Sequence, residues 1–136
     1  MGRVDNKVAI VTGGALGLGN SSCMLLAREG AKVAVTDILD DKGQDAVAQI
    51  KKAGGTAGYW HLDVTNEDEI KGVFADVAKT FGKIDVLVNN AGIADFPTTP
   101  THELANEKWD RVMNVNVRGV FLCTKHAVPY MLEGGP

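Results

Sequence analysis

Apolar residues in this chain alternate between two spacings, and that alternation restricts the fold more than any other feature of the sequence. Short, nearly unbroken apolar runs, typical of strands buried on both faces, occupy residues 7–11, 32–36, 59–62 and 86–88. Stretches with helical spacing follow them, at about residues 20–29, 40–53, 65–81 and 106–131. This pattern predicts an α/β fold, a doubly wound parallel sheet with helices on both faces.

Polar residues and glycines mark the expected ends of these helices. Asp40 and Asp41 lie where helix N-caps favour acids, and Thr65 is the expected cap of the third helix. Gly30 and Gly82 stand where the first and third helices are expected to end.

The composition is ordinary for a soluble globular domain. With 136 residues, 45% of them hydrophobic and 23% charged, the chain has room for one domain with its own core. A net charge of -3 and scattered basic residues give no reason to expect nucleic acid or an anionic membrane as partner. No apolar run approaches the ~18 residues of a membrane span, and no secretory signal is present, so we expect a cytoplasmic protein.

The cysteines and histidines do not have the spacing of a metal site or a disulfide framework. Cys23 and Cys123 each stand within an apolar helical pattern, where a buried thiol is expected. His61, His102 and His126 lack ligand spacing, so we expect them at the surface or at helix ends. We therefore expect no metal.

A glycine-rich turn, residues 12–19, joins the first strand to the first helix. Gly13 would let the strand turn sharply, Gly17 would let the backbone approach a pyrophosphate, and Gly19 would let the helix pack on the sheet. The N–H groups at the helix start would then face the phosphates of a dinucleotide. The spacing G-x-x-x-G-x-G departs from the G-x-G-x-x-G pattern, because Ser22 stands at the place of its third glycine.

Asp37 is the candidate residue for nucleotide selection. It ends the second strand and follows Gly19 by 18 residues, near the interval of about 20 at which an acid reaches the adenosine ribose. As a double acceptor it would bind the ribose hydroxyls of NAD and repel the extra phosphate of NADP. Leu16 and Ile38 supply no cation for that phosphate, so NAD is favoured. The alternative is a solvated acid at a strand end.

Two motifs together resemble the paired signature of the classical short-chain dehydrogenase/reductase family: the glycine turn and the Asn-Asn-Ala-Gly sequence at residues 89–92. Asp63-Val64 and Asn116 match the family as well, and the resemblance covers essentially the whole chain. It implies a Rossmann-type fold, with the Asp-Val pair at the adenine ring and Asn89 in a structural role that ties the sheet together. The expected cofactor contacts are Gly13, Leu16, Gly17, Leu18, Gly19, Asp37, Ile38, Asp63, Val64, Asn90, Ala91 and Gly92.

Asn116 is the expected catalytic residue of this chain. It falls in the middle of the apolar face of the last helix, after Val112 and Met113 and before Val120. A buried amide without partners costs roughly 1–3 kcal/mol, so this position needs a compensating contact. A core amide bonded to neighbouring backbone is one explanation. The resemblance implies another, a water held in the proton relay of the catalytic lysine, and Asn114 is expected on the polar side.

The resemblance places the other acid–base groups outside this chain. In the family a Ser and a Tyr-x-x-x-Lys pair lie beyond the fourth strand and its helix, whereas this sequence stops at Pro136, where a fifth strand is expected. Tyr130 is followed four residues later by Gly134 in place of a lysine. We therefore expect residues 1–136 to be the NAD-binding part of a longer single-domain dehydrogenase, truncated after the fourth strand and its helix and inactive alone.

The implied function is an oxidoreductase that moves a hydride between NAD and the carbon of a small-molecule alcohol or ketone. A non-catalytic NAD-binding fragment or module is the alternative, and a Ser followed by Tyr-x-x-x-Lys after Pro136 would decide for the enzyme. The extended branch of the fold, epimerases and dehydratases of nucleotide sugars, is disfavoured, because its usual turn G-x-x-G-x-x-G is not present.

The last helix carries an indication of self-association. Phe121 and Leu122 lie outside its main apolar arc, beyond what one core face needs. Burial against a second subunit would explain that excess, and family members commonly associate through this helix. We therefore expect a homo-oligomer.

Overall fold

A parallel sheet with strand order β3-β2-β1-β4 forms the centre of the computed structural model, which describes residues 2–95 and 98–134. The strands are β1 (Val8–Thr12), β2 (Lys32–Asp37), β3 (Thr56–His61) and β4 (Val86–Val88). The helices are α1 (Gly17–Arg28), α2 (Asp40–Lys52), α3 (Glu67–Phe81), α4 (Asn106–Met113) and α5 (Gly119–Glu133). The predicted α/β fold is confirmed, although α1 and β3 each begin three residues earlier than predicted.

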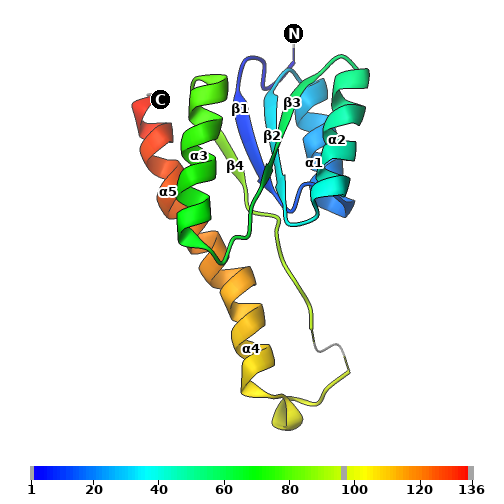
Figure 1. Cartoon of the computed structure of the whole chain (residues 1–136), viewed down its shortest axis with the longest axis vertical. Coiled ribbons are helices and arrows are strands. Elements are labelled where there is room, and N and C mark those ends of the chain that lie inside the picture. The colour runs from blue at the N-terminus through cyan, green and yellow to red at the C-terminus, as the bar shows by residue number, and fades with distance from the viewer. Residues whose placement is uncertain (1, 96–97, 135–136) are drawn as a thin grey trace.

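Helices cover both faces of the sheet, with α1 and α2 on one side and α3 and α5 on the other (Figure 1). The strand period of two explains this arrangement, because successive side chains of β1 point to opposite faces. Val8 and Ile10 are fully buried in a core with Phe74 of α3, while Ala9 and Val11 are fully buried in the core beneath α1 and α2. Both cores confirm that β1 is a strand buried on both faces, and β2 is buried in the same way, whereas β3 and β4 are only partly buried.

The strand order positions the site. β1 lies between β2 and β4, so the chain runs outward to β3 and then crosses to the opposite side of β1. In open α/β sheets ligands bind outside the carboxyl ends of the strands at such a switch point. α4 extends beyond that end of the sheet, alongside the segment that follows β4 (Figure 1).

The caps of two helices differ from the prediction. Asn66, and not Thr65, caps α3, because its Oδ1 accepts a hydrogen bond from the N–H of Glu69 at 3.1 Å. Thr65 lies one residue earlier, in the turn after β3. Asp40 and Asp41 stand inside the first turn of α2 and make no cap. There they interact favourably with the helix dipole, which explains why acids occur at this place.

The predicted last helix is interrupted by a π-helical turn, Asn114–Arg118, between α4 and α5. A π-helical turn is wider than an α-helical one, so it shifts the phase of the residues that follow. Leu122 is consequently buried in the core, with 1% of its surface exposed, whereas Phe121 is 59% exposed. The expectation that both lie outside the core is therefore wrong for Leu122.

Both cysteines are buried, as predicted. Burial raises the pKa of the Cys23 and Cys123 thiols to about 12, so both are protonated and unreactive at neutral pH. Among residues 2–95 and 98–134, no helix is long and apolar enough to cross a membrane. The same residues contain no group of three or more His, Cys, Asp or Glu placed to hold a metal ion.

Candidate nucleotide-binding site

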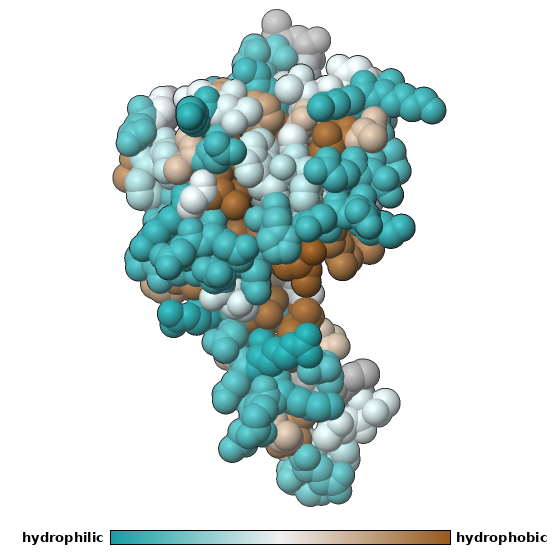
Figure 2. Space-filling model, viewed as in Figure 1, coloured by the Kyte–Doolittle hydropathy of each residue, from teal (hydrophilic) through white to brown (hydrophobic). Residues whose placement is uncertain are grey.

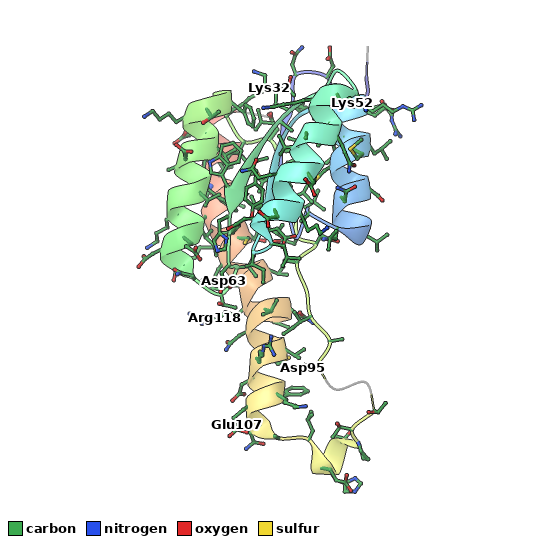
Figure 3. All side chains as sticks on the ribbon, turned by 45° about the vertical axis from the view of Figure 1, so that its right-hand side comes forward. Lys32, Lys52, Asp63, Asp95, Glu107 and Arg118 are labelled. Atoms are coloured by element: carbon green, nitrogen blue, oxygen red, sulfur yellow. The ribbon has the colours of Figure 1, made fainter. Side chains whose placement is uncertain are left out.

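A cleft of about 790 Å³ lies at the carboxyl ends of the strands, between the sheet and α4. Figure 3 shows Asp63 at this edge of the sheet and Asp95 and Glu107 beyond it along α4, with Lys32 at the opposite end of β2. Apolar surface gathers at the waist where α4 leaves the sheet (Figure 2). The predicted contacts that line the cleft are Gly13, Leu16, Asp37, Ile38, Asp63, Val64, Asn90, Ala91 and Gly92.

The glycine turn has the backbone geometry that its sequence predicts. Gly13 and Gly17 have φ of +64° and +56°, a region that side chains disfavour. A Cβ at Gly17 would meet nothing within 4 Å, whereas a Cβ at Gly19 would collide with the carbonyl oxygen of Gly13. Gly19 is thus required for close packing of α1 on the turn. At Gly17, in contrast, no atom lies close to the backbone on the side where a Cβ would stand.

The first turn of α1 leaves backbone donors available for an anion. Its first intrahelical hydrogen bond joins the N–H of Asn20 to the carbonyl of Leu16 at 3.1 Å, so the N–H groups of residues 17–19 precede any intrahelical acceptor. The N-cap Leu16 supplies no side-chain cap. The free N–H groups can donate hydrogen bonds to a pyrophosphate, and the helix dipole favours its negative charge. The open backbone at Gly17 leaves room for it to approach. Gly17, Leu18 and Gly19 lie in this first turn and do not line the cleft itself.

Asn90 holds the turn after β4 against the glycine turn. Its Nδ2 donates to the carbonyl oxygens of Thr12 (3.1 Å) and Gly13 (3.0 Å). The hydroxyl oxygen of Thr12 in turn accepts from the N–H groups of Asn90 (3.1 Å) and Ala91 (3.0 Å). The tie across the sheet, expected of Asn89, is therefore made by Asn90. Asn89 is exposed and donates to the hydroxyl of Thr124 on α5 at 3.3 Å.

The Asp37 carboxylate faces the cleft and is held by backbone. Its Oδ2 accepts from the N–H of Ala15 at 3.0 Å, and its Oδ1 accepts from the N–H groups of Ile38 (2.8 Å) and Leu39 (3.1 Å). A carboxylate has about four acceptor sites, so a further hydrogen bond to Oδ2 is available. The side chains of Leu16 and Ile38, 52% and 59% exposed, flank it without charge.

Asp63 and Val64 form the wall of the cleft that follows β3. Asp63 Oδ1 accepts from the N–H (2.9 Å) and the hydroxyl (2.7 Å) of Thr65, which fixes the turn into α3. Val64 is buried, and a Cβ at Gly119 would lie 2.7 Å from its Cγ2. α5 can therefore approach this wall closely only because residue 119 is glycine.

Asn116 is exposed, which contradicts the expectation of a buried amide. It lies in the π-helical turn, and in the described chain Met113 and Val120 on the same helical segment are also more than a third exposed. Its amide is nevertheless bonded to neighbouring backbone: Oδ1 accepts from the N–H of Ile93 and Nδ2 donates to the carbonyl of Ile93, each at 2.8 Å. One acceptor site and one donor of the amide remain.

A polar cluster borders the site at the start of α2. The hydroxyl of Tyr59 lies 2.6 Å from Oδ1 of Asp40, and Nδ1 of His61 lies 2.7 Å from the same oxygen. The hydrogen bond from Tyr59, followed by that from His61, lowers the pKa of Asp40. The hydrogen bond with Asp40 raises the pKa of His61, and burial is the first cause of the raised pKa of Tyr59.

Sequence reasoning missed the contribution of α4 to the cleft. Glu107, Asp110, Arg111 and Asn114 line it, although Asn114 was expected on the polar side. No spacing in the sequence points to these residues, because the side of α4 that faces the cleft depends on how the helix packs in the folded chain. Arg111 forms an ion pair with Asp95 at 3.1 Å, which links α4 to that segment.

Comparison with known proteins identifies the family of this chain. Residues 7–136 match the family described as short chain dehydrogenase. Curated relatives include cyclopentanol dehydrogenase of Comamonas testosteroni, 47% identical over 96% of this chain and 52% of the relative. They also include secoisolariciresinol dehydrogenase of Forsythia intermedia (46% identical; 96% and 46% covered) and cis-4-hydroxycyclohexanecarboxylate dehydrogenase of Sinomonas cyclohexanicum (42% identical; 95% and 51% covered).

The chain spans about half the length of the curated relatives it matches. The family model, in contrast, matches all but the first six residues. On these matches, and with a glycine turn, an Asn-Asn-Ala-Gly turn and a parallel sheet in the expected places, the chain belongs to the short-chain dehydrogenase family.

Proposed function

We propose that this chain is the NAD-binding part of an oxidoreductase. The observation that carries the proposal is that three segments far apart in the sequence meet at one cleft: the glycine turn, the acid that ends β2, and the turn after β4. Asn90 and Gly13, 77 residues apart, are hydrogen-bonded there. Free N–H groups at α1 suit a pyrophosphate, and family membership implies a nicotinamide cofactor.

NAD, rather than NADP, is the cofactor that we propose. Asp37 would accept a hydrogen bond from a ribose hydroxyl at Oδ2 and repel a 2′-phosphate. Among the described residues that line the cleft, the one cation is Arg111, and its charge is compensated by Asp95 at 3.1 Å. The other residues that we propose to contact NAD are those of the glycine turn, Asp63 and Val64 at the adenine ring, and residues 90–92.

The proposed reaction is hydride exchange with a secondary alcohol or its ketone, and the bound cofactor would donate or accept the hydride. In the full-length protein a Tyr would be the general acid and base, with a Lys lowering its pKa. Asn116 would contribute the remaining donor and acceptor of its amide to a water in that relay. Two relatives are named for cyclopentanol and cis-4-hydroxycyclohexanecarboxylate, which supports a ring alcohol as the first substrate to test.

The test uses the full-length protein that contains these residues. Titration with NAD and NADP, followed by turnover assays with cyclopentanol and related ring alcohols, should give tighter binding of NAD and NADH production. Equal or tighter binding of NADP would contradict the assignment of the cofactor. Tight NAD binding without turnover of any alcohol or ketone would favour a binding module over an enzyme.

The full-length protein is further proposed to be a homo-oligomer. Trp109, Val117 and Phe121 expose 53%, 54% and 59% of their surface along the last helical segment of the described chain. Burying such side chains in a subunit interface would remove apolar area from water. Sedimentation at micromolar concentration should therefore give a species larger than the monomer. A clean monomer would refute the proposal.

A further inference from the structure

The turn between β2 and α2 carries the Asp37 side chain and is fixed from several directions. Three backbone N–H groups hold the carboxylate, as described above. The carbonyl oxygen of Asp37 accepts from the N–H of Leu62, the residue after β3, at 2.9 Å. The carboxylate cannot move toward or away from the cleft unless this backbone moves with it.

Tyr59 of β3 makes an additional contact with the same turn. Its hydroxyl lies 2.8 Å from the carbonyl oxygen of Asp37 and 2.6 Å from Oδ1 of Asp40, so it can donate to either oxygen. These two residues are the last of β2 and the first of α2. One side chain therefore joins both ends of the turn that presents Asp37.

The ring of Tyr59 is itself held in place. It packs against α2 at Gly43, where a Cβ would collide with the ring. Tyr59 is paired with Val35 in the parallel register of β2 and β3, which fixes its position along the strand relative to the end of β2. His61, two residues further along β3, reaches the same Oδ1 of Asp40 at 2.7 Å and supports it from the same strand.

We infer that Tyr59 is a positioning residue for cofactor selection: its hydroxyl holds the β2–α2 turn so that the Asp37 carboxylate is directed at the ribose of NAD. This inference rests on the proposed function, in which Asp37 discriminates NAD from NADP. Tyr59 does not line the cleft, so it acts through Asp37 and not by contact with the cofactor.

The experiment compares variants of the full-length protein by the KM for NAD and for NADP and by kcat at saturating NAD. Tyr59→Phe removes the hydroxyl and leaves the ring. We expect its KM for NAD to rise roughly 3- to 10-fold, the size expected for one lost hydrogen bond, and its preference for NAD over NADP to fall. The kcat at saturating NAD should stay within about two-fold, since the reacting groups are untouched.

Three further variants make the result specific. Tyr130→Phe removes the chain's other phenolic hydroxyl, which lies on α5 away from the turn, and should leave the preference unchanged. Gly43→Ala displaces the ring and should act like Tyr59→Phe. Asp40→Asn keeps an acceptor for Tyr59 and should retain most of the preference for NAD.

Two outcomes would overturn the inference, and they differ. If Asp37→Ala changes the NAD/NADP ratio but Tyr59→Phe behaves like Tyr130→Phe, the positioning role is wrong and the proposed function stands. If Asp37→Ala itself leaves the ratio unchanged, selection by Asp37 fails and the role of Tyr59 falls with it. An equal rise in KM for both cofactors in Tyr59→Phe would indicate a general structural effect and would also reject the inference.

Discussion

Replacing Asp37 with alanine in the full-length protein is expected to weaken NAD binding roughly 10- to 100-fold and to leave NADP binding equal or tighter. A hydrogen bond to a charged group contributes about 1.5–3 kcal/mol, and the carboxylate would accept one such bond from a ribose hydroxyl. The same carboxylate would repel a 2′-phosphate, so its loss removes a penalty for NADP. Isothermal titration with each cofactor measures both effects.

Asp41→Ala is the matched control for this prediction. Asp41 is an exposed acid in the first turn of α2, so its removal changes the net charge by the same amount close to the site. We expect the NAD/NADP ratio of this variant to equal that of the unmodified protein. An unchanged ratio in Asp37→Ala, or an equal change in Asp41→Ala, would show that Asp37 does not select the cofactor.

A polypeptide of these 136 residues alone is expected not to oxidise alcohols. Neither tyrosine is followed at the fourth position by lysine: Asp63 stands there after Tyr59 and Gly134 after Tyr130. General acid–base catalysis contributes typically ~10²–10⁴-fold, and without it turnover would be lost in the background. The assay incubates mass-verified polypeptide with NAD and a panel of secondary alcohols and follows NADH absorbance.

The polypeptide is also expected to associate. β4 pairs only with β1 in the described sheet, so its outer edge presents unpaired backbone groups beside half-buried Val86, Leu87 and Val88. Such an edge is a template for pairing with another chain.

One result of the turnover assay would contradict the prediction of inactivity. NADH production above a cofactor-only control by a monodisperse 136-residue chain would mean that the catalytic groups lie within these residues.

The fold could be predicted largely from apolar spacing. The apolar runs that form β1 and β2 are buried on both faces, and a continuous apolar run is the pattern expected of such a strand. β3 began before its predicted start because Thr56, Ala57 and Gly58 are small or polar and give little apolar signal. The π-helical turn could not be predicted either, because a helical pattern read with a constant period assumes that every turn has the same width.

The candidate site was predicted in part. The glycine turn could be recognised because its positive φ angles and close packing require glycine, as Gly13 and Gly19 illustrate. The exposure of Asn116 could not, because a helical wheel places a residue on an arc without saying what covers that arc. The contacts of Tyr59 with the turn between β2 and α2 depend on the register of β2 and β3, which cannot be predicted from the residues of one strand alone.

A crystal structure of the full-length protein with NAD tests the central claim most directly. We expect the pyrophosphate at the N–H groups of residues 17–19, an adenosine ribose hydroxyl within hydrogen-bonding distance of Oδ2 of Asp37, and the adenine ring against Asp63 and Val64. The nicotinamide should then lie beyond Gly92, toward Asn116. NAD bound elsewhere on the protein, or bound in this cleft with its ribose away from Asp37, would contradict the assignment of this site.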